Sequence, residues 1–186
     1  MRRIIVGISG ASGSAYGFTM LRALHAISEI ETHLVLSEQA PVTIALEMPG
    51  KNAQDFEALA DVVHRESDLA ASISSGSFRT DGMVVIPCSI KTASAIAYSF
   101  NDNLIARAAD VCLKERRKLV LVVRETPLHL GHLRTLTQLA EIGAVTLPPV
   151  PAMYARPASI DDIVHHTVGK VLDQFDIRNE LFTRWK

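Results

Sequence analysis

Five short runs of apolar residues recur along the chain, and longer stretches with helical spacing separate them. The runs are rich in β-branched residues and apolar on both faces, as expected of parallel strands that helices cover. They span residues 3–8, 32–37, 82–87, 118–123 and 144–148. Apolar residues that recur at three and four positions predict amphipathic helices over residues 15–27, 103–117, 129–143 and 159–175. Strands and helices that alternate in this way predict an α/β fold, a doubly wound and mainly parallel sheet flanked by helices.

The segment from 49 to 79 departs from this alternation. It is polar and has no strong strand pattern, so we expect one helix over residues 54–63 and a surface loop. The chain has 186 residues, of which 48% are hydrophobic and 21% charged. That length and composition predict a single domain, residues 1–186, with one good-sized core and no linker.

Charge and composition narrow the classes of partner. The net charge of −1 argues against nucleic-acid binding, which usually needs a basic face. No apolar run approaches the ~20 residues that span a bilayer, so no membrane association is expected. Cys88 and Cys112 are far from any paired spacing, and the N-terminus has no signal-peptide pattern. Both features are typical of a cytoplasmic protein.

The first predicted strand runs into a loop of small residues, SGASGSAYG. Gly10, Gly13 and Gly17 would let a ligand approach the backbone, and the following helix start favours an anion or an electron-rich ring edge. The spacing matches the dinucleotide fingerprint poorly, and the second strand ends in Ser37 with no acidic residue, so NAD binding is disfavoured. A tight strand-to-helix turn without a ligand remains an alternative.

Two other strands end in polar residues. Ser89, Lys91 and Thr92 follow the third strand at another helix start, and Arg124 and Glu125 follow the fourth. Each group alone has an ordinary explanation as a helix cap or a solvated loop. Because ligands of open α/β sheets bind at the carboxyl ends of the strands, the groups together favour a phosphate-bearing ligand.

Several longer blocks resemble the UbiX-type flavin prenyltransferases in order and spacing. These blocks are GISGASGSAYG, SSGSF, VVIPCSIKTASAIA, NLIARAADVCLKERRKLVLVVRETPLH and GAVTLPPVPAMYARPASIDDIV, with a late RW. The resemblance implies a Rossmann-like, flavodoxin-like subunit that binds FMN between subunits of a homododecamer. It implies transfer of a dimethylallyl group from dimethylallyl phosphate to N5 and C6 of reduced FMN. The product, prenylated FMN, would serve a UbiD-type decarboxylase in ubiquinone biosynthesis or a related pathway.

The resemblance also assigns roles to matching residues. It implies FMN contacts at Gly10, Ala11, Ser12, Ser37, Ser89, Ile90, Lys91, Thr92 and Arg124. It places Arg107, Lys114, Tyr154 and Lys170 around the prenyl phosphate, some of them from a neighbouring subunit. Such a leaving group needs cations and a phenol to neutralise its charge. Without the resemblance, Lys114 reads as a solvated helix end.

Four residues are implied in the chemistry itself. Glu125 is the candidate acid and base, because N5 and C6 lose protons and the departing phosphate gains one. Glu47 and Ser12 would orient or polarise the flavin edge. Trp185 would cover the substrate and exclude water, or else anchor the C-terminus as a hydrophobic group.

The sequence also differs from the family pattern. Glu38 stands where the family commonly has Lys and is expected to point to solvent, and Lys170 stands where Arg is common. A Trp that some relatives carry before the SGS motif is missing.

Neither a metal site nor a reactive thiol is expected. The pairs His129/His132 and His165/His166 lack a third ligand, so no metal is expected. We interpret Cys88 as small packing beneath the flavin rather than an activated thiol.

Two other functions remain open. One is an FMN-dependent decarboxylase of the peptidyl-cysteine and phosphopantothenoylcysteine type, although the PPVPAMYARP segment lacks the Asn of that group's P-x-M-N motif. The other is a non-catalytic flavin carrier, which would have no use for the prenyl-phosphate cations. The sequence does not distinguish dimethylallyl monophosphate from the diphosphate.

Overall fold

A computed structural model describes residues 1–185 of the chain. Its centre is a six-stranded sheet in the order β3-β2-β1-β4-β5-β6, with every neighbouring pair parallel. The strands are β1 Arg2–Ile8, β2 Ile30–Leu36, β3 Val62–Arg65, β4 Gly82–Cys88, β5 Lys118–Val123 and β6 Val145–Thr146. All five predicted strands are present, and the predicted fold class is confirmed.

The strand β3 corrects the reading of the segment 49–79. Helix α3 covers only Ala53–Glu57, and the predicted helix over 54–63 was wrong at its end, where Val62 and Val63 begin β3. Asp61 directly precedes this edge strand, and its carboxylate accepts a hydrogen bond of 2.7 Å from the backbone N–H of Thr32 on β2. Without β3, the five predicted strands follow one another in the sheet in the order of the flavodoxin fold. With β3 at the edge, the sheet has the six-stranded Rossmann order.

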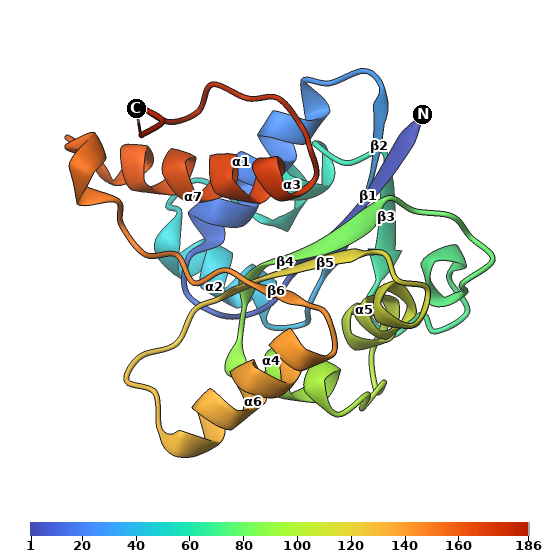
Figure 1. Cartoon of the computed structure of the whole chain (residues 1–186). Helices are drawn as coiled ribbons and strands as arrows, with labels where there is room; N and C mark the ends of the chain where they lie inside the picture. Colours follow the sequence, from blue (N-terminus) through green and yellow to red (C-terminus); the bar gives the residue numbers. More distant parts are fainter. Residues whose placement is uncertain (186) are drawn as a thin grey trace.

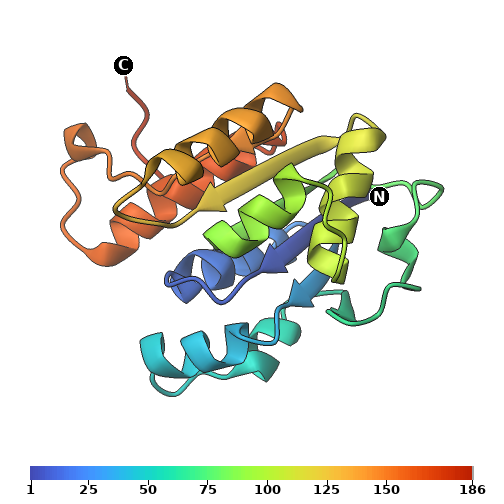
Figure 2. The ribbon, with the colours of Figure 1, turned by 90° about the horizontal axis from the view of Figure 1, so that it is seen from below.

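Helices cover both faces of the sheet (Figure 1). One face carries α1 Ser14–His25, α2 Ala40–Glu47, α3 and α7 Ile160–Gln174, and the other carries α4 Ile90–Ala97, α5 Leu104–Lys114 and α6 Leu130–Glu141. Figure 2 looks at the second face, where α4, α5 and α6 lie across the strands. Along β1, Ile4, Val6 and Ile8 pack on the first face and Ile5 on the second. This alternation follows from the two-residue period of a strand.

Strands β1 and β4 are neighbours in the sheet, although two other strands separate them along the chain. Their connections lead to helices on opposite faces, α1 and α4, so a crevice opens at their carboxyl ends. After α7, the chain turns back and runs over this helix toward its start (Figure 1). Within residues 1–185, no helix has both the length and the apolar character needed to cross a bilayer.

Candidate functional site at the strand ends

Ser9 joins the ends of β1 and β4. Its hydroxyl donates to the carbonyl oxygen of Pro87 at 2.8 Å and accepts from the backbone N–H of Ser89 at 2.8 Å. A weaker bond of 3.4 Å reaches it from the backbone N–H of Ala11. The Ser9 residue is only 2% exposed. This side chain therefore fixes the glycine loop of β1 against the start of α4.

Glu47 is the last residue of α2, and its side chain reaches the start of α1. Its carboxylate accepts hydrogen bonds from the backbone N–H groups of Gly13, at 2.9 and 3.0 Å, and Ser14, at 2.8 Å. Partial burial raises the pKa of the Glu47 carboxyl, but hydrogen bonds from Ser12, Ser14 and Gly13 outweigh it, and the pKa lies below its ordinary value. The anion expected at this helix start is therefore the chain's own carboxylate. Gly13 allows the approach because its backbone is left-handed, with φ of 110°.

A first hollow of about 320 Å³, here called the Ser37 hollow, opens on one side of the glycine loop. Its lining includes the predicted residues Gly10, Ser37, Ser89, Lys91 and Thr92. The Ser37 hydroxyl is buried and has no hydrogen-bond partner among the described residues. Because a buried hydroxyl without a partner is costly, a polar ligand in this hollow would satisfy it.

The start of α4 forms the floor of the Ser37 hollow. The Ser89 hydroxyl caps this helix by accepting from the backbone N–H of Thr92 at 3.2 Å, and it lies 3.0 Å from the Thr92 hydroxyl. Ile90 begins the helix, and amides of a first helical turn have no partner within the helix. Together with the Lys91 ammonium, these groups suit a phosphate. Glu38 also lines the hollow, but its side chain is exposed, as predicted.

A second hollow of about 370 Å³, the Arg124 hollow, opens on the other side of the glycine loop. Ser12, Tyr16, Arg124 and Glu125 line it, together with the segment 148–150. The backbone N–H of Arg124 donates to the carbonyl of Cys88 at 3.0 Å, which ties the end of β5 to the end of β4. The predicted Arg124 and Glu125 therefore lie beside the glycine loop.

The Arg124 hollow also contains a phenol that the sequence interpretation missed. Burial raises the pKa of Tyr16, and a hydrogen bond with Thr167 and the Arg124 charge act in the opposite direction. Its position in the first turn of α1, directly after the glycine loop, was the available signal.

Four side chains on and beside α7 form what we call the donor cluster: Tyr154, His166, Lys170 and Trp185. The rings of Tyr154 and Trp185 are 5.0 Å apart and perpendicular, and the Tyr154 hydroxyl lies 3.4 Å from Nε2 of His166. Burial, and after it the Lys170 charge, lower the pKa of His166. The structure therefore brings Tyr154 and Trp185 together, as the resemblance implied, and Lys170 lies one helical turn beyond their neighbour His166. His166 was missed, although its spacing of four from Lys170 places both on one side of the helix.

Trp185 is 75% exposed in the single chain and contacts Tyr154 with its ring edge, so its roles as substrate cover or hydrophobic anchor both stay predictions. The half-buried Leu181 and Phe182 hold the tail.

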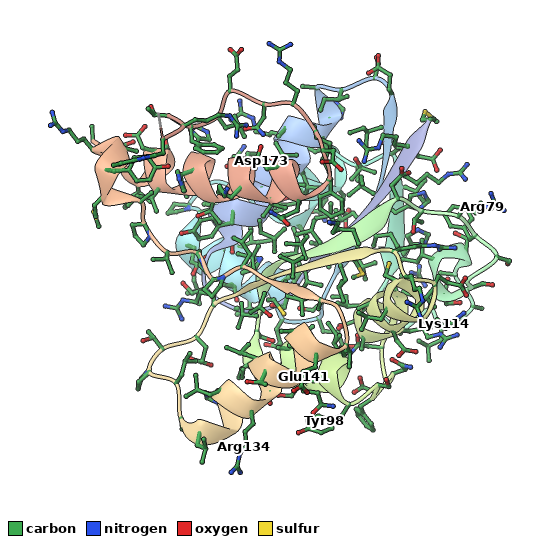
Figure 3. The ribbon with its side chains drawn as sticks, in the orientation of Figure 1. Arg79, Tyr98, Lys114, Arg134, Glu141 and Asp173 are labelled. Atoms are coloured by element: carbon green, nitrogen blue, oxygen red, sulfur yellow. The ribbon has the colours of Figure 1, made fainter. Side chains whose placement is uncertain are left out.

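Arg107 and Lys114 lie away from the donor cluster. Both are on α5, on the opposite face of the sheet from α7, and Figure 3 shows Lys114 far from Asp173 of α7. The Arg107 guanidinium donates to the carbonyl of Ser74 at 3.0 Å, and Lys114 pairs with Glu115. Within one chain, the four predicted phosphate residues therefore form two separate pairs.

Cys88 and the pair His129/His132 pack or cap within the fold. Cys88 is fully buried, and burial raises the pKa of its thiol far above the ordinary range, which confirms that it is packing rather than an activated thiol. The ring centroids of His129 and His132 are 3.6 Å apart with the ring planes tilted by 34°, and His129 caps α6. In residues 1–185, no three metal-binding side chains converge.

Comparison with known proteins identifies the family. The Flavoprotein family model matches residues 1–172. The chain is 60% identical to the flavin prenyltransferase UbiX of Escherichia coli (strain K12) over 188 residues, covering 100% of this chain and 99% of that protein. The chain belongs to the UbiX family of flavoproteins. The resemblance read from the motifs is therefore confirmed.

Two solved structures of UbiX-like proteins superpose on the chain. The structure of AnUbiX (PadA1) in complex with FMN and dimethylallyl pyrophosphate is 50% identical, with a TM-score of 0.97 over 100% of this chain and 97% of that one. A dodecameric FMN-dependent UbiX-like decarboxylase from Escherichia coli O157:H7 is 52% identical, with a TM-score of 0.97 over 99% of each chain.

Proposed function

We propose that this chain is a flavin prenyltransferase, which moves a dimethylallyl group from dimethylallyl phosphate to N5 and C6 of reduced FMN. The observation that carries the proposal is the agreement between two sets of residues. Seven of the nine residues that the resemblance assigns to FMN line the Ser37 and Arg124 hollows, in a chain 60% identical to UbiX over its full length. Prenylated FMN would then pass to a UbiD-type decarboxylase.

The residues of the Ser37 hollow fit the phosphate end of FMN. The unpartnered Ser37 hydroxyl, the Ser89 and Thr92 hydroxyls and the Lys91 ammonium offer donors to a phosphate. The glycine loop contributes Gly10 to this hollow and Ser12 to the Arg124 hollow, so a ligand along the loop would extend from one to the other. Arg124 then lies at the isoalloxazine end.

The chemistry needs an acceptor and a proton carrier. Reduced FMN, when bound, supplies the nucleophilic atoms N5 and C6. The Glu125 carboxylate lines the same hollow as Ser12 and Arg124. There it would take the proton that N5 loses and pass it to the departing phosphate oxygen. It would then take the proton that C6 loses and pass it to the alkene carbon of the prenyl group, so the flavin gains C5H8 and the carboxylate is regenerated. Glu47 holds the glycine loop beside this hollow through its bonds to Gly13 and Ser14.

The donor cluster suits the leaving phosphate and the allylic group. Lys170 and the Tyr154 phenol would neutralise the phosphate as the C–O bond breaks, and Trp185 would shield the allylic carbon from water. Arg107 and Lys114 lie on the opposite face of the same chain, so they would join only from a neighbouring copy. This requirement supports a closed oligomer, which we propose is a homododecamer.

A mass measurement tests the function. The purified protein is incubated anaerobically with reduced FMN and dimethylallyl phosphate or diphosphate, and the flavin is weighed by mass spectrometry. We expect a gain of one C5H8 unit. A flavin of unchanged mass with both donors would leave a carrier or a decarboxylase as the explanation.

The Glu125→Gln variant tests the proton carrier. Its single-turnover rate should fall about 10²- to 10⁴-fold, with FMN affinity nearly unchanged. The matched control Glu141→Gln, an exposed position on α6, should keep both. Loss of FMN binding with an unchanged rate for the bound fraction would make Glu125 a structural carboxylate.

A further inference from the structure

Asp173 of α7 holds the C-terminal tail, which we define as residues 179–185. Its carboxylate receives both terminal nitrogens of Arg184, with Nη1 2.9 Å from Oδ2 and Nη2 2.8 Å from Oδ1. Nδ2 of Asn179 donates to Oδ1 at 3.0 Å. One carboxylate on α7 therefore binds the tail at its first residue, Asn179, and near its end, at Arg184.

Gly169 provides independent evidence that the tail packs at a defined position on α7. A Cβ at this position would lie 2.3 Å from Cδ1 of Phe182, so only glycine admits the ring against the helix. Nδ2 of Asn179 also donates to the carbonyl of Gly169 at 3.2 Å. His166, one turn earlier on α7, meets the same Phe182 ring edge-on at 4.7 Å.

Asp173 acts on two members of the donor cluster. Trp185 directly follows Arg184 and lies edge-on to the Tyr154 ring, although both side chains are largely exposed. The Lys170 ammonium lies 3.9 Å from Oδ2 of Asp173, on the same oxygen that Nη1 of Arg184 approaches. One carboxylate therefore contacts Lys170 directly and acts on Trp185 through the neighbouring Arg184.

We infer that Asp173 is a positioning residue, which docks the C-terminal tail so that Trp185 closes over Tyr154 and Lys170 faces the prenyl donor. The part that concerns the donor rests on the proposed function. Docking of the tail does not depend on it.

The ionised form of Asp173 is the one that acts. The hydrogen-bonded Arg184 guanidinium is the main cause that lowers the pKa of the Asp173 carboxyl, against a smaller effect of burial that raises it. The carboxylate is therefore charged at neutral pH and can hold Arg184 and Lys170 together.

A double-mutant cycle with two readouts tests the inference. The variants are Asp173→Ala, Arg184→Ala and the double variant, and the control is Asp176→Asn, an exposed carboxylate just beyond α7. Trp185 is the only tryptophan of the chain, so time-resolved fluorescence anisotropy reports the local motion of the tail alone. Steady-state kinetics on the full-length enzyme give kcat and the KM for dimethylallyl phosphate.

We expect the amplitude of the fast anisotropy decay to grow in both single variants and to grow no further in the double variant. Each single substitution already removes the same Asp173–Arg184 ion pair. The KM for dimethylallyl phosphate should rise about three- to tenfold, the range of a charge-assisted pair at a largely exposed site. FMN affinity and the control should stay unchanged. If Asp173→Ala does not fold, Arg184→Ala, changed only in the exposed tail, gives the same test.

Two results would overturn the inference. Unchanged anisotropy in Asp173→Ala or Arg184→Ala, or additive effects in the double variant, would show that the pair does not dock the tail. A mobile tail with unchanged KM and kcat would remove the role in donor capture. A wild-type enzyme that prenylates no flavin would instead refute the proposed function, and the anisotropy would still decide the docking.

Discussion

Replacing Ser9 with alanine removes the link between β1 and β4 at the candidate site. The Ser9 hydroxyl makes two hydrogen bonds of 2.8 Å, and its loss leaves the Ser89 N–H without that acceptor. An unpaired buried donor costs about 1–3 kcal/mol, so we expect Ser9→Ala to lower the free energy of unfolding by about 2 kcal/mol. With an m-value of about 2 kcal/mol per M, the urea midpoint should fall by about 1 M.

The same substitution should loosen the start of α4, since Ser89 caps that helix and lines the Ser37 hollow. We therefore expect FMN affinity to fall about tenfold, equivalent to about 1.4 kcal/mol. Urea unfolding at fixed protein concentration and calorimetric FMN titration measure the two effects. The control Ser75→Ala removes an exposed hydroxyl that bonds only to Ser77 and should shift stability by less than about 0.5 kcal/mol. Unchanged midpoint and affinity in Ser9→Ala would refute the reasoning.

Three further predictions concern stability and reactivity. The pKa of Glu47 is lower in the folded state, so its contribution is complete above about pH 4.5 and is lost as the pH falls through the folded pKa. Urea midpoints from pH 3 to 6 should fall more steeply for wild type than for Glu47→Gln, and parallel curves would contradict this.

Gly17→Ala should lower the free energy of unfolding by about 1–3 kcal/mol, because the new Cβ would lie 2.8 Å from a backbone oxygen of β4. The control Gly131→Ala meets only a side-chain ring and should cost less. Equal shifts of the melting temperature in the two variants would be inconsistent with this. Cys88 and Cys112 should react with a thiol reagent only on unfolding, since burial raises both pKa values, that of Cys112 to about 12. Stoichiometric labelling of the native protein would disprove it.

The sheet was predictable where strands are buried on both faces. Apolar runs such as 82–87 and 118–123 are β4 and β5, because a central parallel strand needs apolar residues on each side. Strand β3 was missed because it is a four-residue edge strand with alternating half-buried positions. Its pairing depends on Asp61 and β2, a contact between segments 29 residues apart that no local pattern shows.

The site was predictable where it follows strand ends and not where it depends on side chains from elsewhere. Ser89, Lys91 and Thr92 directly follow β4, so parallel topology alone brings them to the crevice. Glu47 comes from the end of α2, and its bonds to the glycine loop require the packing of two helices. The Asp173 carboxylate likewise acquires its role only when the tail folds back.

The two halves of the proposed site differ in how firmly one chain holds them. The Ser37 hollow is lined by residues that directly follow β1 and β4, among them the buried Ser9 that ties the two strand ends together, so its shape depends on the core. The donor cluster consists mostly of exposed side chains. The tail that carries Trp185 is held by the Asp173 carboxylate and by packing of Phe182 on Gly169. Exposed side chains lose few contacts when they move, so ordering them costs conformational entropy that contacts with a neighbouring molecule must offset. A neighbouring copy that brings Arg107 and Lys114 to this cluster would supply both the missing charge and the missing wall, and the single chain would bind flavin before it could transfer a prenyl group.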